Sequence, residues 1–142
     1  MPLIDDVAIA DILRSVNTVA LLGASHRAER PSYGVMRFLL RRGCRVYPVN
    51  PGLAGRKLLG QQVYARLADL PETVDMVDVF RNAAHLPTIV EETILCQIGI
   101  LWTQLGVIDH AAAQRAEDQG IRVVMDRCPA IEWPRLQRSG LL

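Results

Sequence analysis

Short apolar runs rich in β-branched residues alternate along the chain with stretches whose apolar positions recur every three or four residues. The first pattern predicts β-strands and the second predicts amphipathic helices. We expect five strands, at residues 18–22, 45–49, 74–80, 98–102 and 121–125. We expect helices at residues 5–15, 33–42, 65–70, 84–96, 109–119 and 131–137, and a short extended piece within residues 58–64.

Particular residues support the helix boundaries. Asp109 is suited to cap a helix N-terminus, and Gly43 and Gly120 are suited to end the helices before them. We expect two helices to bury apolar residues: Val7, Ile9, Ile12 and Leu13 in the first, and Val35, Met36, Leu39 and Leu40 in the second.

Strands that alternate with helices are typical of an α/β fold, because parallel strands need helical, right-handed crossovers. We therefore expect a three-layer, Rossmann-like, doubly wound sheet of about five mainly parallel strands, with helices on both faces. The sequence contains no repeat, low-complexity tract or linker, so residues 1–142 are expected to form a single domain. Ligands of such sheets bind at the carboxyl ends of the strands, and the loops there are the expected site.

The composition excludes several classes of protein. Of 142 residues, 50% are hydrophobic and 22% are charged, which is too apolar for intrinsic disorder. No apolar run approaches the roughly 18 residues that cross a bilayer, and Asp5 and Asp6 stand where a secretory signal would carry basic residues. Three irregularly spaced cysteines fit neither a disulfide framework nor a zinc site. These features predict a cytoplasmic protein without a metal site.

The net charge of +1 conceals a strongly basic segment. Residues 23–57 carry a net charge of +7, and acidic residues on either side restore the balance. One basic segment in a nearly neutral chain favours a localised anionic ligand over a nucleic acid. A solvated helix face accounts for part of the excess, because Arg37, Arg41 and Arg42 fall in the second predicted helix.

The loop after the first strand begins with Gly23, Ala24 and Ser25 and leads into a helix near Ser32. Such a loop can bind phosphate through hydroxyl groups and the positive N-terminus of the helix. The Gly-x-Gly-x-x-Gly fingerprint is absent, so an ordinary strand-to-helix turn is the alternative.

The second strand ends without the acidic residue that binds the ribose hydroxyl in most NAD-binding domains. Arg56 and Lys57 follow instead, and they suit an additional ribose phosphate or simply face solvent. Arg81 and Arg127 follow later strands, where an arginine needs an anionic partner. For Arg127 that partner is a ligand or a nearby acid.

Five motifs, each after a predicted strand, occur in a defined order: Gly23-Ala24-Ser25 with Arg30 and Ser32-Tyr33, then Pro48-Val49-Asn50-Pro51, Phe80-Arg81, Trp102-x-Gln104-x-Gly106 and Asp126-Arg127-Cys128. Together they resemble the small stand-alone coenzyme A-binding protein family, which is similar to the nucleotide-binding domain of the succinyl-coenzyme A synthetase alpha subunit. The resemblance covers residues 12–136. One departure is Ala28, where similar proteins often have proline and this chain has Pro31 instead.

The resemblance implies a site for coenzyme A or an acyl-coenzyme A. The first loop and the following helix would hold the pyrophosphate, and Arg30, Arg56 or Lys57 would meet the 3′-phosphate. The residues it assigns to the ligand are Gly23, Ala24, Ser25, Arg30, Ser32, Tyr33, Pro48, Asn50, Pro51, Lys57, Phe80, Arg81, Trp102, Gln104, Gly106, Arg127 and Cys128. Pro48, Asn50, Pro51 and Phe80 would enclose the adenosine, with Arg81 near its anionic groups, and Trp102, Gln104, Gly106 and Cys128 would line the path of the pantetheine arm.

Catalysis has little support in the sequence. None of His26, His85 and His110 has a neighbouring nucleophile or acid that suggests a catalytic pair. Cys128 is either a thiol activated by its basic neighbour or a small residue packed at a strand end. The alternatives to coenzyme A binding are an NAD(P)-dependent enzyme or redox sensor, and a ligand-binding subunit of a larger acyl-coenzyme A synthetase-like complex. The apolar composition is compatible with a homodimer.

Overall fold

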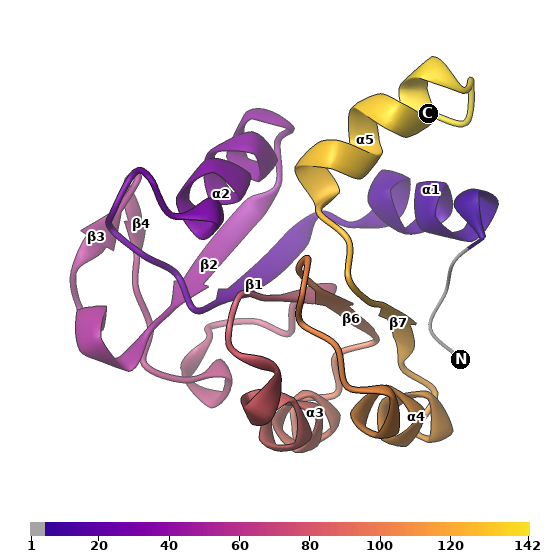
Figure 1. Cartoon of the computed structure of the whole chain (residues 1–142). Coiled ribbons are helices and arrows are strands. Elements are labelled where there is room, and N and C mark those ends of the chain that lie inside the picture. Colours follow the sequence, from indigo (N-terminus) through magenta and orange to yellow (C-terminus); the bar gives the residue numbers. More distant parts are fainter. Residues whose placement is uncertain (1–4) are drawn as a thin grey trace.

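The structure is a computed structural model, and residues 5–142 are described here. Helices and parallel strands alternate along the chain (Figure 1). The helices are α1 (Asp6–Ser15), α2 (Pro31–Arg41), α3 (Leu86–Leu95), α4 (His110–Asp118) and α5 (Pro129–Arg138). The strands are β1 (Thr18–Leu22), β2 (Arg45–Val49), β3 (Lys57–Leu58), β4 (Gln61–Gln62), β5 (Met76–Val79), β6 (Ile100–Thr103) and β7 (Arg122–Val124).

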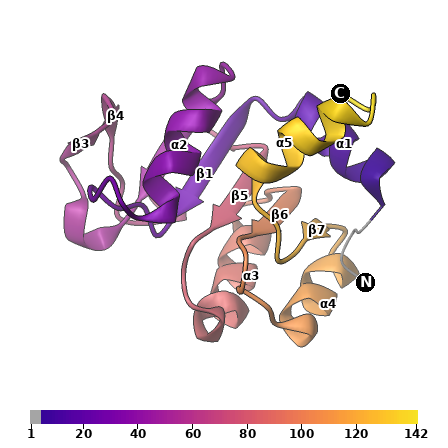
Figure 2. The ribbon, with the colours of Figure 1, turned by 45° about the horizontal axis from the view of Figure 1, so that its top comes forward.

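Five strands form one parallel sheet in the order β2-β1-β5-β6-β7. Figures 1 and 2 show α1, α2 and α5 over one face of this sheet and α3 and α4 over the other. The strand order reverses between β1 and β5, which creates the switch point where ligands of doubly wound sheets bind. The predicted Rossmann-like, three-layer fold is confirmed.

Each face of the sheet has its own core, built almost entirely from aliphatic residues. On one face Ile9, Met36 and Leu136 pack from the three helices, and on the other face Ile89 and Ala113 pack from α3 and α4. These side chains are buried because alternate residues of a strand point to opposite faces and each helix turns its apolar stripe inward. The two cores hold the carboxyl ends of the strands at one rigid edge.

Backbone hydrogen bonds align the loops that leave this edge. Phe80 donates its N–H to the carbonyl oxygen of Leu22 (2.8 Å), and Gln104 donates its N–H to that of Val79 (3.1 Å). Gly23 makes the corresponding bond to Val49 (3.1 Å). Because each bond joins the first residue of a loop to the last residue of the neighbouring strand, the loops begin side by side.

A small hairpin of β3 and β4 follows β2, where the sequence predicts an extended piece over residues 58–64. Its return segment lies against β2, because Tyr64 forms a parallel bridge with Val49 and donates its N–H to the carbonyl oxygen of Pro48 (2.9 Å). The hairpin therefore covers the outer edge of β2 and projects beyond α2 (Figure 2).

Several predicted boundaries require correction. The second helix begins at Pro31 rather than at residue 33, because proline is well suited to the first helical turn. Residues 65–70 form only a 3₁₀ turn at Leu67–Asp69, and the helix expected at 84–96 is a 3₁₀ turn at Ala83–His85 followed by α3. The last helix begins at Pro129, two residues before its predicted start.

Of the predicted core residues, Val7 does not reach the core and Leu40 packs against it only in part. Val7 is 64% exposed, because it lies two residues, or about 200° of helical rotation, from Ile9. Leu40 is only partly buried at the edge of the α2 stripe. The predicted caps are confirmed: Asp109 accepts a hydrogen bond from the N–H of Ala112, and Gly43 and Gly120 have positive φ angles.

Ion pairs join the first and last helices. Arg135 in α5 binds the carboxylates of Asp6 in α1 (2.8 Å) and Glu132 (2.9 Å), and Glu132 also pairs with Arg127 (2.8 Å). The guanidinium of Arg135 lowers the pKa of Asp6 below its ordinary value.

No helix among residues 5–142 has the length and apolar character that a membrane span requires.

Candidate functional site

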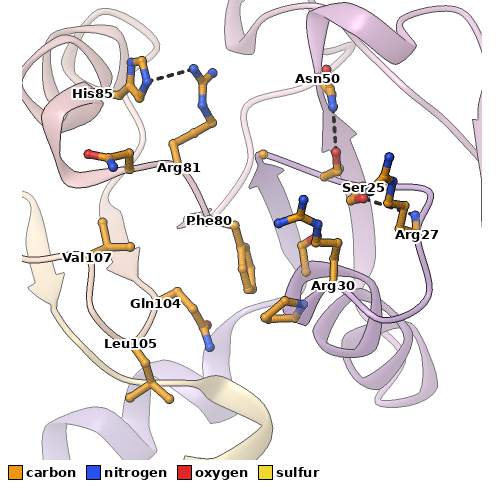
Figure 3. Close-up of a pocket in the computed structure, with 15 residues that line it drawn as sticks. Ser25, Arg27, Arg30, Asn50, Phe80, Arg81, His85, Gln104, Leu105 and Val107 are labelled. Carbon is orange, nitrogen blue, oxygen red and sulfur yellow. Dashed lines mark hydrogen bonds between the residues drawn. The ribbon is translucent and has the colours of Figure 1, made fainter.

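A cleft of about 590 Å³ opens at the carboxyl edge of the sheet, between the loops that follow β1, β5 and β6 (Figure 3). The residues that line it are Gly23, Ala24, Ser25, Arg27, Arg30, Pro31, Ser32, Asn50, Phe80, Arg81, Asn82, His85, Gln104, Leu105 and Val107. The cleft lies at the switch point of the sheet, as the fold predicts for a ligand site.

Gly23 begins the loop after β1 and permits close approach of the neighbouring chain. Its φ angle is +85°, and a Cβ atom there would lie 3.1 Å from the backbone carbonyl of Phe80 and 3.2 Å from the Cδ of Arg81. Only glycine fits both the backbone angle and the space. The side chain of Asn50 supports the same loop, since its Nδ2 donates to the carbonyl oxygen of Ala24 (2.8 Å) and its Oδ1 accepts from Gly52 (2.8 Å).

The N-terminus of α2 faces the cleft without a side-chain cap. Arg30 is the N-cap residue and makes no capping hydrogen bond. Ser32, the second residue of this helix, lines the cleft and offers a hydroxyl group there. A hydroxyl group and an uncapped helix N-terminus both provide donors to an anion.

Arginines give the cleft a strong positive charge. Arg27, Arg30 and Arg81 line it, and none of the other lining residues is Asp or Glu. Among the described residues, none of these three arginines has an ion-pair partner, whereas six of the other twelve arginines do. Arg81 is not isolated, because its guanidinium lies 3.1 Å from the Nε2 of His85 and can donate a hydrogen bond to it.

The loop after β6 provides a less polar wall. Leu105 and Val107 lie there, and the ring of Phe80 projects between this wall and the start of α2 (Figure 3). Gln104 extends from the same loop, and its side chain is nearly buried. The cleft therefore has a cationic region and a mainly apolar region.

A second cleft of about 490 Å³ adjoins the first and shares Gly23 and Arg81 with it. Its walls are mainly apolar, with Leu22, Val49 and Ile89 among them. Pro51, which the sequence assigns to the ligand site, lines this second cleft. A ligand that extends past Arg81 from one cleft into the other would occupy both.

The structure brings together nine of the residues assigned from the sequence: Gly23, Ala24, Ser25, Arg30, Ser32, Asn50, Phe80, Arg81 and Gln104 all line the main cleft. Others do not line it: Tyr33, Pro48, Lys57, Trp102, Gly106, Arg127 and Cys128. The assigned residues around the switch point are therefore close together. Most of the assigned residues that do not line the cleft lie within strands or in the loop after β7.

Three of the assigned residues that do not line the cleft make contacts elsewhere in the fold. Trp102 is completely buried in the core, and its indole N–H donates to the carbonyl oxygen of Arg127 (2.8 Å). Arg127 pairs with Glu132, the alternative of a nearby acid that its sequence context left open. Cys128 is buried at the N-cap of α5, in agreement with the packing interpretation.

The remaining residues of this group border the cleft or lie beyond it. Tyr33 points its ring toward Arg37, whose guanidinium lies 5.8 Å from the ring centre. Pro48 is buried within β2, and Lys57 is exposed in the β3–β4 hairpin. Gly106 has a φ angle of +80° and shapes the loop after β6.

Six lining residues were not assigned from the sequence: Arg27, Pro31, Asn82, His85, Leu105 and Val107. Arg27 lies in the loop before α2, and Pro31 is the first residue of that helix. His85 is brought to the cleft by the unexpected 3₁₀ turn at Ala83–His85, which begins at Asn82. Asn82, a residue type that commonly caps helical turns, was the available signal for this turn, because its side chain accepts a hydrogen bond from the N–H of Ala84.

Asp126 positions the loop after β6, although it lies twenty residues further along the sequence than Gly106. Its Oδ1 accepts a hydrogen bond from the N–H of Gly106 (2.7 Å), and its own N–H donates to the hydroxyl of Thr103 (3.1 Å). Asp126 has a φ angle of 62°, a left-handed conformation that Asp and Asn adopt more readily than other side chains. The loops after β6 and β7 are thus joined.

We expect Asp126→Ala to lower the free energy of unfolding by about 1–2 kcal/mol, because it removes this hydrogen bond and leaves a left-handed alanine. Asp126→Asn is the matched control and should stay within about 0.5 kcal/mol, since its amide oxygen can accept the same bond. Urea unfolding measures both values. An Asp126→Ala variant as stable as Asp126→Asn would contradict the assignment.

No group of His, Cys, Asp and Glu side chains within residues 5–142 is arranged to bind a metal ion. The arrangement of the cleft instead suits a large anion, because the loops after β1, β5 and β6, an uncapped helix N-terminus and three arginines meet at one edge of the sheet.

Comparison with known proteins agrees with this arrangement. The Bacillus subtilis protein YneT, described as uncharacterized, is 31% identical over 120 residues, which cover 84% of this chain and 87% of YneT. A solved structure from Thermus thermophilus is 37% identical, with a TM-score of 0.89, and the match covers 94% of this chain and 99% of the other. The alpha subunit of the ADP-forming acetate–CoA ligase I of Pyrococcus furiosus is 30% identical over 89 residues, which cover 58% of this chain but only 19% of that subunit.

The family described as the CoA binding domain matches residues 17–134, a span that contains every strand of the five-stranded sheet and every residue of the cleft. The chain therefore belongs to the CoA binding domain family.

Proposed function

We propose that the chain binds coenzyme A, or an acyl-coenzyme A, in the cleft at the switch point, and that it does so without catalysing a reaction by itself. The observation that carries this proposal is the set of unpaired donors in the cleft. Arg27, Arg30 and Arg81 have no ion-pair partner among residues 5–142, and Ser32 adds a hydroxyl group to the lining of the same cleft.

Coenzyme A fits this set of residues by charge. Its pyrophosphate and 3′-phosphate carry several negative charges, and phosphate oxygens accept hydrogen bonds. The uncapped N-terminus of α2 with Ser32 would hold the pyrophosphate. Arg81 lies between the two clefts, so it can meet an anionic group of a ligand that extends into both.

The second cleft provides the apolar surface that an adenine ring requires. Leu22, Val49 and Ile89 contribute aliphatic side chains there, and Pro51 adds a rigid wall. The pantetheine arm would then extend along Phe80 and the loop after β6. Bound coenzyme A would supply a thiol or thioester, while the residues of this chain bind and orient it.

A partner protein would provide any chemistry in this scheme. One relative with a named activity is a ligase subunit of which this chain matches 19%, so most of that subunit has no counterpart in the match. In the cleft itself, His85 is engaged as an acceptor of the Arg81 hydrogen bond. These observations favour a binding role over a catalytic one.

Calorimetric titration with coenzyme A, 3′-dephospho-coenzyme A and NAD tests the proposal. We expect coenzyme A to bind most tightly, and we expect loss of the 3′-phosphate to weaken binding about tenfold, because one charge-assisted contact is lost. An NAD(P)-binding function predicts instead that NAD or NADP binds at least as tightly as coenzyme A. Equal binding of all three ligands, or binding of none, would overturn the proposal.

A further inference from the structure

His85 is the residue of the main-cleft lining whose side chain can gain or lose a charge near neutral pH. It ends the 3₁₀ turn at Ala83–His85, and its ring stands beside the guanidinium of Arg81 (Figure 3). The Nε2 of His85 and the Nη2 of Arg81 are 3.1 Å apart. Neither the motifs of the sequence nor the role proposed for Arg81 involves this histidine.

The two charge states of His85 suit different partners. In the neutral imidazole one ring nitrogen accepts a hydrogen bond, and Arg81, which only donates, is a suitable partner for it. In the protonated imidazole both nitrogens donate, so the ring and the guanidinium then need an acceptor that they can share. A phosphate group is such an acceptor, because its oxygens accept several hydrogen bonds from charged donors.

The charges around His85 favour an anion as that shared partner. The three arginines of the main cleft line it together with His85, and the loop after β6 contributes no titratable side chain to the lining. On α3, which directly follows the 3₁₀ turn, Glu92 lines the second cleft beyond Arg81, and Glu91 is paired with an arginine of α4. A proton on His85 would therefore add a further positive charge to a site that is already cationic.

We propose that His85 couples binding of the ligand to uptake of a proton, by donating a hydrogen bond to a phosphate group that Arg81 also holds. The proton comes from the solvent, and no bond of the ligand is broken. The proposal rests on the proposed function, since it needs a ligand with phosphate groups in this cleft. Because the bound state holds more protons than the free protein, the affinity falls as the pH rises through the range in which histidine loses its charge.

Calorimetric titration with 3′-dephospho-coenzyme A between pH 5.5 and pH 8 tests this coupling at fixed ionic strength. The pyrophosphate diester of this ligand stays ionised throughout that range, whereas the 3′-phosphate of coenzyme A itself titrates at about pH 6. We expect the affinity at pH 6 to exceed that at pH 8 by about five- to tenfold, since one coupled proton allows at most about a tenfold change for each pH unit. Titrations in two buffers of different ionisation enthalpy should show directly that a proton is taken up.

His85→Gln is the test variant, because a glutamine side chain does not titrate and its amide oxygen can still accept a hydrogen bond from Arg81. We expect its affinity to be independent of pH and to match that of the unmodified protein at pH 8. His26→Gln and His110→Gln are the matched controls. Both residues are exposed and neither lines the cleft, so both variants should retain the full pH dependence. Urea unfolding should show that all three variants are folded.

The outcomes separate this inference from the proposed function. An unmodified protein that binds 3′-dephospho-coenzyme A equally tightly at pH 6 and pH 8 would overturn the inference and leave the proposed function standing. So would a pH dependence that survives in His85→Gln or disappears in His26→Gln. If neither coenzyme A nor its dephospho form binds at any pH, the proposed function itself fails, and the inference fails with it.

Discussion

Replacing Arg81 by methionine is expected to weaken the binding of coenzyme A by about 10- to 100-fold. Arg81 is a lining residue of both clefts and packs against Gly23, so its guanidinium is central to the positive region. A hydrogen bond to a charged group contributes about 1.5–3 kcal/mol, which corresponds to this range of affinity. Arg81→Lys should recover part of the loss, since lysine restores the charge but not the planar, two-pronged geometry.

Arg41→Met is the matched control for this experiment. It removes the same charge from the last turn of α2, whereas the cleft lies at the first turn of that helix. Calorimetric titration at fixed salt should give the control an affinity within about twofold of the unmodified protein. If Arg81→Met bound coenzyme A normally, or Arg41→Met weakened binding equally, the cleft around Arg81 would not be the binding site.

The second large effect concerns Asp78, in the middle of β5. Its side chain is completely buried, and neither carboxylate oxygen has a hydrogen-bond partner in the described part of the chain. Its neighbours in register are Leu21 and Trp102, both fully buried. Burial raises the pKa of Asp78 well above its ordinary value of 3.8, because removal from water disfavours the charged form.

This raised pKa makes the protein less stable as the pH rises. Above pH 3.8 the unfolded chain releases the proton of Asp78, whereas the folded protein retains it up to its raised pKa. The folded state therefore binds more protons in this window, and the free energy of unfolding falls by up to about 1.4 kcal/mol for each pH unit. Below pH 3.8 both states are protonated, and this loss disappears.

Asp78→Asn should remove most of this pH dependence, since the amide has a similar shape and does not titrate. We expect the free energy of unfolding of the variant to depend less on pH, so that the variant compares more favourably with the unmodified protein at pH 7 than at pH 4. Urea unfolding followed by circular dichroism between pH 4 and pH 8 measures this difference.

Comparing the two proteins isolates Asp78 from other groups. Ion pairs or hydrogen bonds lower the pKa values of Asp6, Glu72 and Glu91, and these groups contribute an opposite pH dependence to both proteins alike. Asp118→Asn, at an exposed position of α4, should leave the pH profile unchanged. Parallel profiles for Asp78→Asn and the unmodified protein would contradict the argument.

The pattern of apolar residues was sufficient to predict the fold and the edge of the sheet that carries the cleft. Parallel strands bring their carboxyl ends together, so residues directly after β1 and β5, such as Ser25 and Arg81, could be placed without further knowledge. The same pattern did not determine whether a side chain at the end of a strand points into the core or toward the cleft. Trp102 points into the core because it pairs in register with Asp78, and that register is set by contacts between strands far apart in sequence.

Loop paths were the second part that the sequence could not determine. His85 reaches the cleft because a 3₁₀ turn precedes α3, and the sequence around it is equally compatible with a continuous helix. Arg127 lies apart from the cleft because it pairs with Glu132, a choice between partners that depends on where α5 begins. The positions of both side chains depend on the residue at which a helical turn begins, which the pattern of apolar residues does not determine.

The two borders of the sheet bear on how this protein behaves at high concentration. An exposed strand with free backbone groups can join a strand of another molecule and begin aggregation. β2 is shielded on its outer side by the segment around Tyr64, and its Pro48 has no N–H to offer. β7, at the other border, is only three residues long, and its exposed Arg122 pairs with Asp11. Edge-to-edge pairing of sheets from different molecules is therefore disfavoured at both edge strands. Any assembly of copies would have to form through the helices or the loops.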